Sequence, residues 1–99
     1  MNTKNKIKGY ISLAKKSNNL IIGFDNIKNQ LANLNLILVS QDASEKLLKE
    51  INFFSNKYNL DCIQVNHDEL VFYTQIDKCK VIAILNSGIA SQIKMLIKE

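Results

Sequence analysis

Four short aliphatic runs, each separated from the next by an apolar pattern of helical period, constrain the fold more than any other feature. A strand that is apolar throughout is buried on both faces of its sheet, so helices must cover both faces. The alternation therefore predicts an α/β fold, a three-layer α/β/α sandwich around a four-stranded mixed sheet. The strands are predicted at residues 20–22, 36–39, 62–65 and 80–85.

Apolar residues that recur every three or four positions predict five helices between and around these strands. The element order is then αβαβαβαβα, in one domain that spans residues 1–99. Two helix starts carry the spacing of a capping box, Asp42 with Glu45 and Asn66 with Glu69. The helices are predicted at 5–16, from Phe24 through Leu34, from the Asp42 box to Tyr58, around Leu70 and Tyr73, and from Ile89 to Ile97.

The composition argues against a membrane span and against catalysis. No apolar run approaches the roughly 20 residues that cross a bilayer, and we expect a soluble, cytoplasmic protein. The two cysteines, Cys62 and Cys79, lie in apolar segments and are expected to be buried reduced thiols. His67 is expected at the surface. No motif for a nucleophile, a phosphate loop or a metal site is present, so we expect a protein that is not an enzyme and needs no cofactor or metal.

Positive charge is concentrated near the N-terminus. Residues 1–30 contain six lysines and one carboxylate, whereas the remainder contains seven lysines and eight carboxylates. Such a segment attracts phosphate groups, although a solvated lysine face accounts for the same count. Charge alone leaves both interpretations open.

Two strand-to-helix junctions are candidate binding loops. The first runs from Gly23 through Asn26 and the second from Asn86 through Ile89. A helix start exposes free amides that favour phosphate oxygens, and Asp25 and Asn26 add short polar groups that also suit helix capping. The two junctions form one surface only if their strands end at the same edge of the sheet.

Three segments resemble a family of RNA-binding proteins. They are Ile11–Leu20, which contains Leu-Ala-Lys-Lys, then Gly23, and then Leu36–Ser44 with the sequence Leu-Ile-Leu-Val-Ser-Gln-Asp-Ala-Ser. Together they resemble the superfamily that includes the archaeal and eukaryotic large-subunit ribosomal proteins seven and thirty, and in particular its small bacterial ribosomal-protein-like branch. The resemblance extends from about Ile7 to Ile97.

The resemblance implies a protein that binds kink-turn RNA, a helix–bulge–helix element with tandem sheared G·A pairs. In that family a Gly-x-Asn-Glu-x-x-Lys pattern enters the widened groove, and an aliphatic loop before the last helix covers bases expelled from the stack. Irregular RNA elements of this kind admit side chains that a regular RNA major groove excludes.

This chain departs from the family pattern at three of its four positions. Gly23 matches, whereas Asp25 and Asn26 stand at the Asn and Glu positions and Asn29 stands at the Lys position. Lys28 points about 100° away from that position around a helix. The RNA-binding residues that the resemblance and the charge pattern imply are Gly23, Phe24, Asp25, Asn26, Lys28, Asn29, Lys15, Lys16, Asn86, Ser87, Gly88 and Ile89.

The sequence therefore predicts a monomeric, ribosomal-protein-like chain whose partner is kink-turn or ribosomal RNA, with no membrane partner. Two alternatives stay open. One is a protein-interaction module on the same fold, which gains if the lysines of residues 4–16 lie far from the Gly23 edge and that edge is neutral or acidic. The other, a small enzyme or phosphoacceptor domain built around Asp42, has little support because no acidic pocket accompanies that single aspartate.

Overall fold

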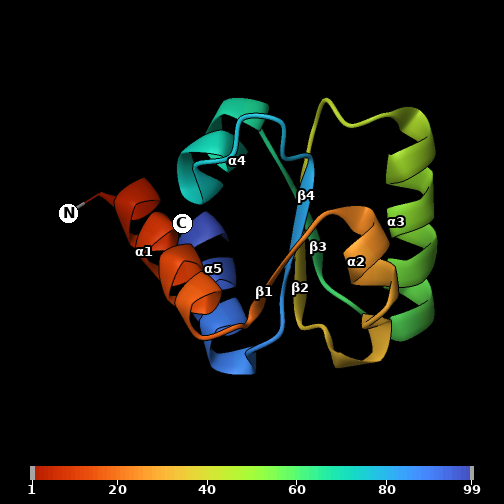
Figure 1. The fold of residues 1–99 in the computed structure, drawn as a ribbon, viewed down its shortest axis with the longest axis horizontal. Helices are drawn as coiled ribbons and strands as arrows, with labels where there is room; N and C mark the ends of the chain where they lie inside the picture. Colours follow the sequence, from red (N-terminus) through yellow and green to blue (C-terminus); the bar gives the residue numbers. More distant parts are fainter. Residues whose placement is uncertain (1, 99) are drawn as a thin grey trace.

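The computed structural model describes residues 2–98 and contains one four-stranded mixed sheet between two layers of helices (Figure 1). The predicted α/β/α class and element order are confirmed. The strands are β1 (Leu20–Ile22), β2 (Leu36–Ser40), β3 (Cys62–Val65) and β4 (Val81–Ile84). The helices are α1 (Thr3–Lys16), α2 (Phe24–Lys28), the short 3₁₀ helix η1 (Leu31–Asn33), α3 (Glu45–Tyr58), α4 (His67–Thr74) and α5 (Ser87–Lys98).

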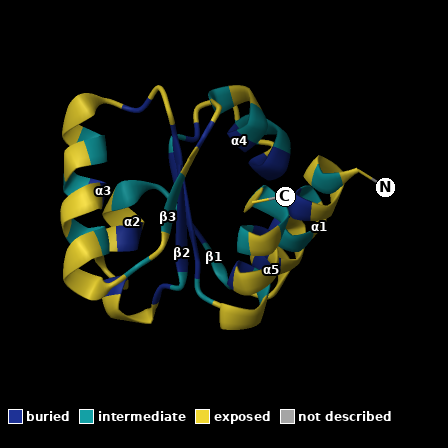
Figure 2. Cartoon of the chain, turned by 180° about the vertical axis from the view of Figure 1, so that it is seen from behind, coloured by how far each residue is buried: buried dark blue, intermediate teal, exposed yellow. Residues whose placement is uncertain are grey.

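The strands lie in the order β1-β4-β2-β3, so β4 and β2 are interior and β1 and β3 form the edges. β4 is antiparallel to both β1 and β2, whereas β2 and β3 are parallel. All five residues of β2 and all four of β4 are buried, as expected for strands covered on both faces. Figure 2 shows this burial along the middle of the molecule.

Each face of the sheet has its own apolar core because successive side chains of a strand point to opposite sides. Ile82 and Ile84 of β4 pack in the core beneath α1, α4 and α5. Val81 and Ala83 of the same strand pack in the core beneath α2, η1 and α3. The helical layers in Figure 1 lie on either side of the sheet accordingly.

The second helix is shorter than the sequence pattern predicted. α2 ends at Lys28, and Gln30 (φ −136°, ψ 26°) leaves the helical region before η1 begins. Leu31 and Leu34 are nevertheless buried in the same core as Ile27. The helical spacing of these apolar residues therefore predicted their burial correctly, although α2, a break and η1 stand where one continuous helix was expected. Burial on one face does not require one continuous helix.

The start of α3 also differs from the prediction. Ser44, not Asp42, is the N-cap residue, and its Oγ accepts a hydrogen bond from the backbone N–H of Leu47 at 3.1 Å. Asp42 is instead held by Ser40 and Lys80. The predicted N-cap residue of α4 is correct, because Asn66 Oδ1 accepts from the backbone N–H of Asp68 at 2.8 Å. Glu69 does not complete the predicted box, because its carboxylate contacts Tyr73 and Lys4 instead.

Candidate RNA-binding site

The two junctions singled out in the sequence lie at opposite ends of the sheet. In the antiparallel β1–β4 pair, Ile22 faces Ile82 and Leu20 faces Ile84. The chain therefore leaves β1 at Gly23 beside the start of β4, where the Gly23 N–H donates to the carbonyl of Val81 at 3.1 Å. One surface built from both junctions is not formed, because antiparallel neighbours end at opposite edges.

The part of the predicted site at the Asn86 end of the sheet is occupied by structural contacts. Asn86 Oδ1 accepts from the backbone N–H of Ile89 at 2.8 Å and so caps α5, while Ser87 and Gly88 form its exposed first turn. Ile89 is half-buried against the core at this end of the sheet, opposite to Gly23, and cannot cover a base held at Gly23. Lys15 and Lys16, in the exposed last turn of α1, lie at this same end.

The part at the Gly23 end is a tight turn into α2. Gly23 has φ 89° and ψ 143°, a conformation that favours glycine. The Asn26 side-chain amide donates to the carbonyl of Ile22 at 2.9 Å and closes the turn. Asp25 is almost fully exposed, and Lys28 Nζ lies 3.6 Å from its Oδ1. Asn29 is the exposed C-cap of α2.

A loop that the sequence analysis missed lies beside Gly23. Residues 75–80 connect α4 to β4, and with the Gly23 turn they border a hollow of about 330 Å³. The interior of the hollow is mainly apolar, and two lysines of the loop, Lys78 and Lys80, are among its lining residues. The paired lysines around Cys79 were the available sequence signal. The residues that line the hollow are Ile22, Gly23, Phe24, Leu47, Ile76, Lys78, Cys79, Lys80 and Val81.

Asp42 organises the polar groups at this end of the sheet. Its Oδ1 accepts a hydrogen bond from the buried Ser40 Oγ, and its Oδ2 accepts from Lys80 Nζ at 2.9 Å. These contacts, the one with Ser40 first, hold the pKa of the Asp42 carboxyl below its ordinary value of 3.8. Lys80 is therefore partly neutralised before any phosphate approaches.

His67 is less exposed than the sequence suggested. Its Nδ1 is buried without a hydrogen-bond partner among the described residues and lies 3.8 Å from Asp42 Oδ1. His67 is the first residue of α4, and the backbone there brings the ring toward the loop after β2. Residues from β2, from α4 and from the 75–80 loop thus surround the Asp42 carboxylate.

The N-terminal lysine surplus does not gather at Gly23. Lys15 and Lys16 lie at the opposite end, Lys4 Nζ is 3.9 Å from Glu69 Oε2, and Lys8 Nζ lies 4.9 Å from the Phe72 ring centroid. At the Gly23 end two lysines are paired with carboxylates and Lys78 forms no ion pair within residues 2–98. This distribution favours the protein-interaction alternative over a purely electrostatic attraction for RNA.

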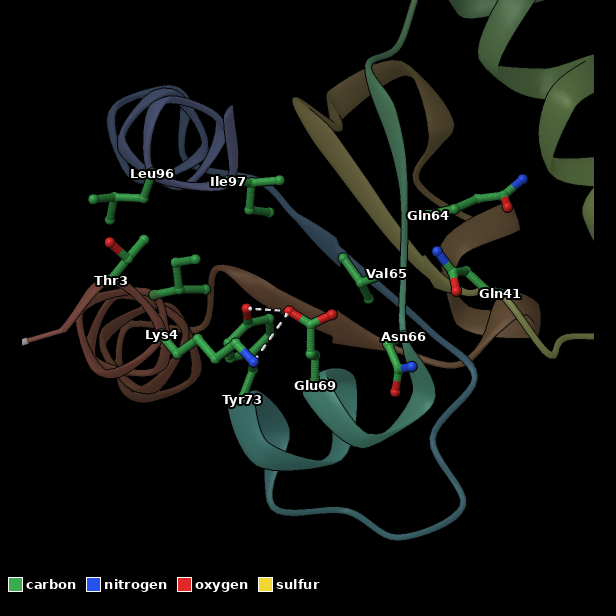
Figure 3. A pocket seen from close by; sticks show the side chains of 11 residues that line it. Thr3, Lys4, Gln41, Gln64, Val65, Asn66, Glu69, Tyr73, Leu96 and Ile97 are labelled. Carbon is green, nitrogen blue, oxygen red and sulfur yellow. Dashed lines mark hydrogen bonds and ion pairs between the residues drawn. The ribbon is translucent and has the colours of Figure 1, made fainter. Parts of the chain in front are cut away.

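A second cavity, of about 360 Å³, lies between the start of α1, the start of α4 and the end of α5 (Figure 3). The Glu69 carboxylate points into it and accepts a hydrogen bond from Tyr73 Oη at 3.4 Å. Burial, and then the nearby Glu69 charge, raise the pKa of Tyr73 to about 12. Lys4 also lies beside the Glu69 carboxylate, which is therefore already paired with a cation and hydrogen-bonded to Tyr73.

Both cysteines carry free thiols, Cys79 buried and Cys62 half-buried. Burial raises the pKa of Cys62 to about 11 and also raises the pKa of Cys79. Such thiols are protonated near neutral pH and are poor nucleophiles or metal ligands. Within residues 2–98 no cluster of His, Cys, Asp or Glu has the arrangement of a metal site.

No family model and no curated protein matches this chain. Solved structures do match, among them one described as a protein with unknown function from Bacillus halodurans C. It superposes with a TM-score of 0.84 over 95% of this chain and 98% of that chain, at 21% sequence identity. The likeness shows that the two chains share a fold. None of the helices in residues 2–98 has the length and apolarity needed to cross a membrane.

Proposed function

We propose that this chain binds structured RNA, of the kink-turn type that the resemblance to the ribosomal proteins seven and thirty implies, through the Gly23 end of its sheet. The observation that carries the proposal is the mainly apolar hollow beside Gly23, which Lys78 and Lys80 help to line. An unstacked base needs an apolar surface, and its phosphate needs a cation, and this hollow offers both.

The proposed contact surface differs from the one expected from sequence. It keeps the Gly23–Asn29 segment and leaves out Asn86–Ile89, Lys15 and Lys16, which lie at the opposite end of the sheet. The 75–80 loop takes their place. Ile76, half-buried at the hollow, takes the role of the aliphatic cover for an expelled base. Asn26 contributes its carbonyl oxygen to RNA, because its amide is engaged with the Ile22 carbonyl.

The proposal implies a protein that acts by binding, not by catalysis. Its place would be in the cytoplasm, as a monomer within a ribonucleoprotein such as the ribosome. The net charge of +4 suits a polyanionic partner. Binding is expected to weaken as salt rises, since each lysine–phosphate contact releases condensed counterions.

A salt titration against a kink-turn RNA and a matched duplex without the G·A pairs tests this function. Lys78→Gln should weaken binding to the kink-turn RNA and reduce the salt slope by about 1. Lys15→Gln, the same change at the opposite end of the sheet, is the matched control and should leave both quantities unchanged. Replacing Asp25 and Asn26 together by Ala should weaken the kink-turn RNA alone.

Equal weak binding of both RNAs, with no difference between the two lysine variants, would contradict the proposal. The second candidate, a protein-interaction module, would then gain. It is favoured by the charge balance at the Gly23 end, where Lys28 and Lys80 are paired with carboxylates, and by Asn29, which lacks the cation of the family pattern.

A further inference from the structure

Phe53 is a large aromatic side chain on the solvent side of α3, with 60% of its surface exposed. Isolated exposed apolar residues are common and need no explanation. Phe53, however, is the outer end of a continuous series of rings that begins at Phe24, the residue after Gly23. Its ring centroid lies 5.2 Å from that of Phe54, which in turn lies 6.1 Å from that of Phe24.

A lysine lies over each end of this aromatic row, which we define as Phe24, Phe54 and Phe53. Lys28 Nζ is 5.1 Å from the Phe24 centroid, and Lys57 Nζ is 6.0 Å from the Phe53 centroid. Lys57 also lies 5.7 Å from the ring of Tyr58, and within residues 2–98 it forms no ion pair. Because Lys28 is paired with Asp25, the unpaired positive charge of the row lies at its Phe53 end, where ring surface is also exposed.

This combination favours nucleic acid over protein as the occupant. Proteins that hold single strands stack bases on aromatic rings and place lysines where the phosphates run. The buried centre of a protein–protein interface is, in contrast, depleted of lysine. Lys57 does not block the ring, because 60% of the Phe53 surface stays exposed with Lys57 Nζ 6.0 Å from its centroid.

The row is continuous with the proposed RNA site, because Phe24 lines the hollow beside Gly23 and also contacts Phe54. An RNA strand that leaves the hollow along this row would reach Phe53. We infer that the aromatic row is a second RNA contact, on which unpaired nucleotides that extend from the structured element stack against Phe53 with their phosphates near Lys57. This inference rests on the proposed function and extends it from a kinked duplex to its single-stranded flank.

The experiment compares three RNAs by fluorescence anisotropy: a kink-turn RNA with blunt ends, the same RNA with an unpaired extension, and the extension alone. The wild-type protein should bind the extended RNA more tightly than the blunt one. Phe53→Leu keeps the apolar bulk and removes the ring. It should weaken binding of the extended RNA about tenfold. Affinity for the blunt RNA should not change.

Two further variants make the test specific. Phe53→Tyr keeps a stacking ring and should bind as the wild type does. Met95→Ala alters an equally exposed apolar side chain on α5, in the other helical layer, and should have no effect on any of the RNAs. Phe53 is exposed, so none of these changes is expected to unfold the protein.

The outcomes separate this inference from the function on which it rests. Equal binding of extended and blunt RNA, or equal behaviour of Phe53→Leu and Met95→Ala, would overturn the inference and leave the kink-turn function intact. Binding of the free extension, sensitive to Phe53 and without binding of the blunt RNA, would support the row and overturn the kink-turn function. Self-association that Phe53→Leu abolishes, with no effect on RNA, would make the row an interface between copies and overturn the inference.

Discussion

At the scale of single residues, the left-handed backbone positions show how this chain manages with few glycines. Asn18, Asn59 and Gln75 adopt positive φ, and the last two end α3 and α4. Asparagine tolerates this region better than most residues, and at such positions it replaces the more common glycine. Gly23, at φ 89° and ψ 143°, lies outside the region that asparagine tolerates and remains glycine.

Gly23→Ala and Gly9→Ala form a matched pair that isolates backbone strain. A Cβ at Gly9 would meet nothing within 4 Å, and one at Gly23 would meet only Asn26 Nδ2 at 4.0 Å. Alanine at Gly9, inside α1, should therefore raise the free energy of unfolding by about 1 kcal/mol. Alanine at Gly23 should lower it by about 1–3 kcal/mol. Chemical denaturation measures both, and equal effects of the two variants would show that Gly23 is not strained.

At the scale of the elements, the polar residues of the loop between β2 and α3 have two different roles, helix capping and tertiary contact. Ser44 serves the helix by accepting from the Leu47 N–H, whereas Asp42 serves the sheet end by holding Lys80. The sequence spacing offered Asp42 with Glu45 as a capping box. In the structure Ser44 takes the N-cap position instead, because it directly precedes the first residue of α3.

Ser44→Ala should therefore destabilise the protein by about 1 kcal/mol, the usual cost of losing an N-cap side chain. Urea unfolding measures the change. Ser44→Asp, which restores an acceptor at a helix start, should recover the wild-type stability. A loss that Ser44→Asp fails to recover would mean that Ser44 matters for a reason other than capping.

At the scale of the whole molecule, the Asp42 cluster joins three parts of the chain that are far apart in sequence. Ser40 ends β2, Lys80 precedes β4 and His67 begins α4, and all three lie against the same carboxylate. The pKa of Asp42 is lowered in the folded protein. Its contribution to stability is therefore present above its ordinary pKa of 3.8 and is lost as pH falls through the lowered value.

Asp42→Asn should accordingly reduce the free energy of unfolding near neutral pH. The difference between this variant and the wild type should shrink as the pH of the denaturation experiment is lowered from about 7 toward about 2, because protonation of the wild-type carboxyl in the folded state removes its contribution. Asp77→Asn, an exposed carboxylate on the neighbouring loop, is the control. A difference that is the same at both pH values would show that Asp42 does not act through its charge.

Several features of this protein follow from its sequence alone. Strands β1 and β3 were predicted with the bounds that the structure has, and the helix order was also correct, since both depend on local apolar periodicity. The continuous helix through Leu34 was wrong, because periodicity records which side chains are buried and not whether the backbone between them is unbroken.

Tertiary structure alone decided how the candidate site is assembled. The sequence singled out Gly23 and Asn86 as junctions, yet strand direction, which no local pattern encodes, places them at opposite ends of the sheet. The same topology brings the 75–80 loop to Gly23 and aligns Phe24 with Phe54 across two helices. The physical reason is that apolar periodicity acts over a few residues, whereas strand order and direction arise from burying two cores against one sheet.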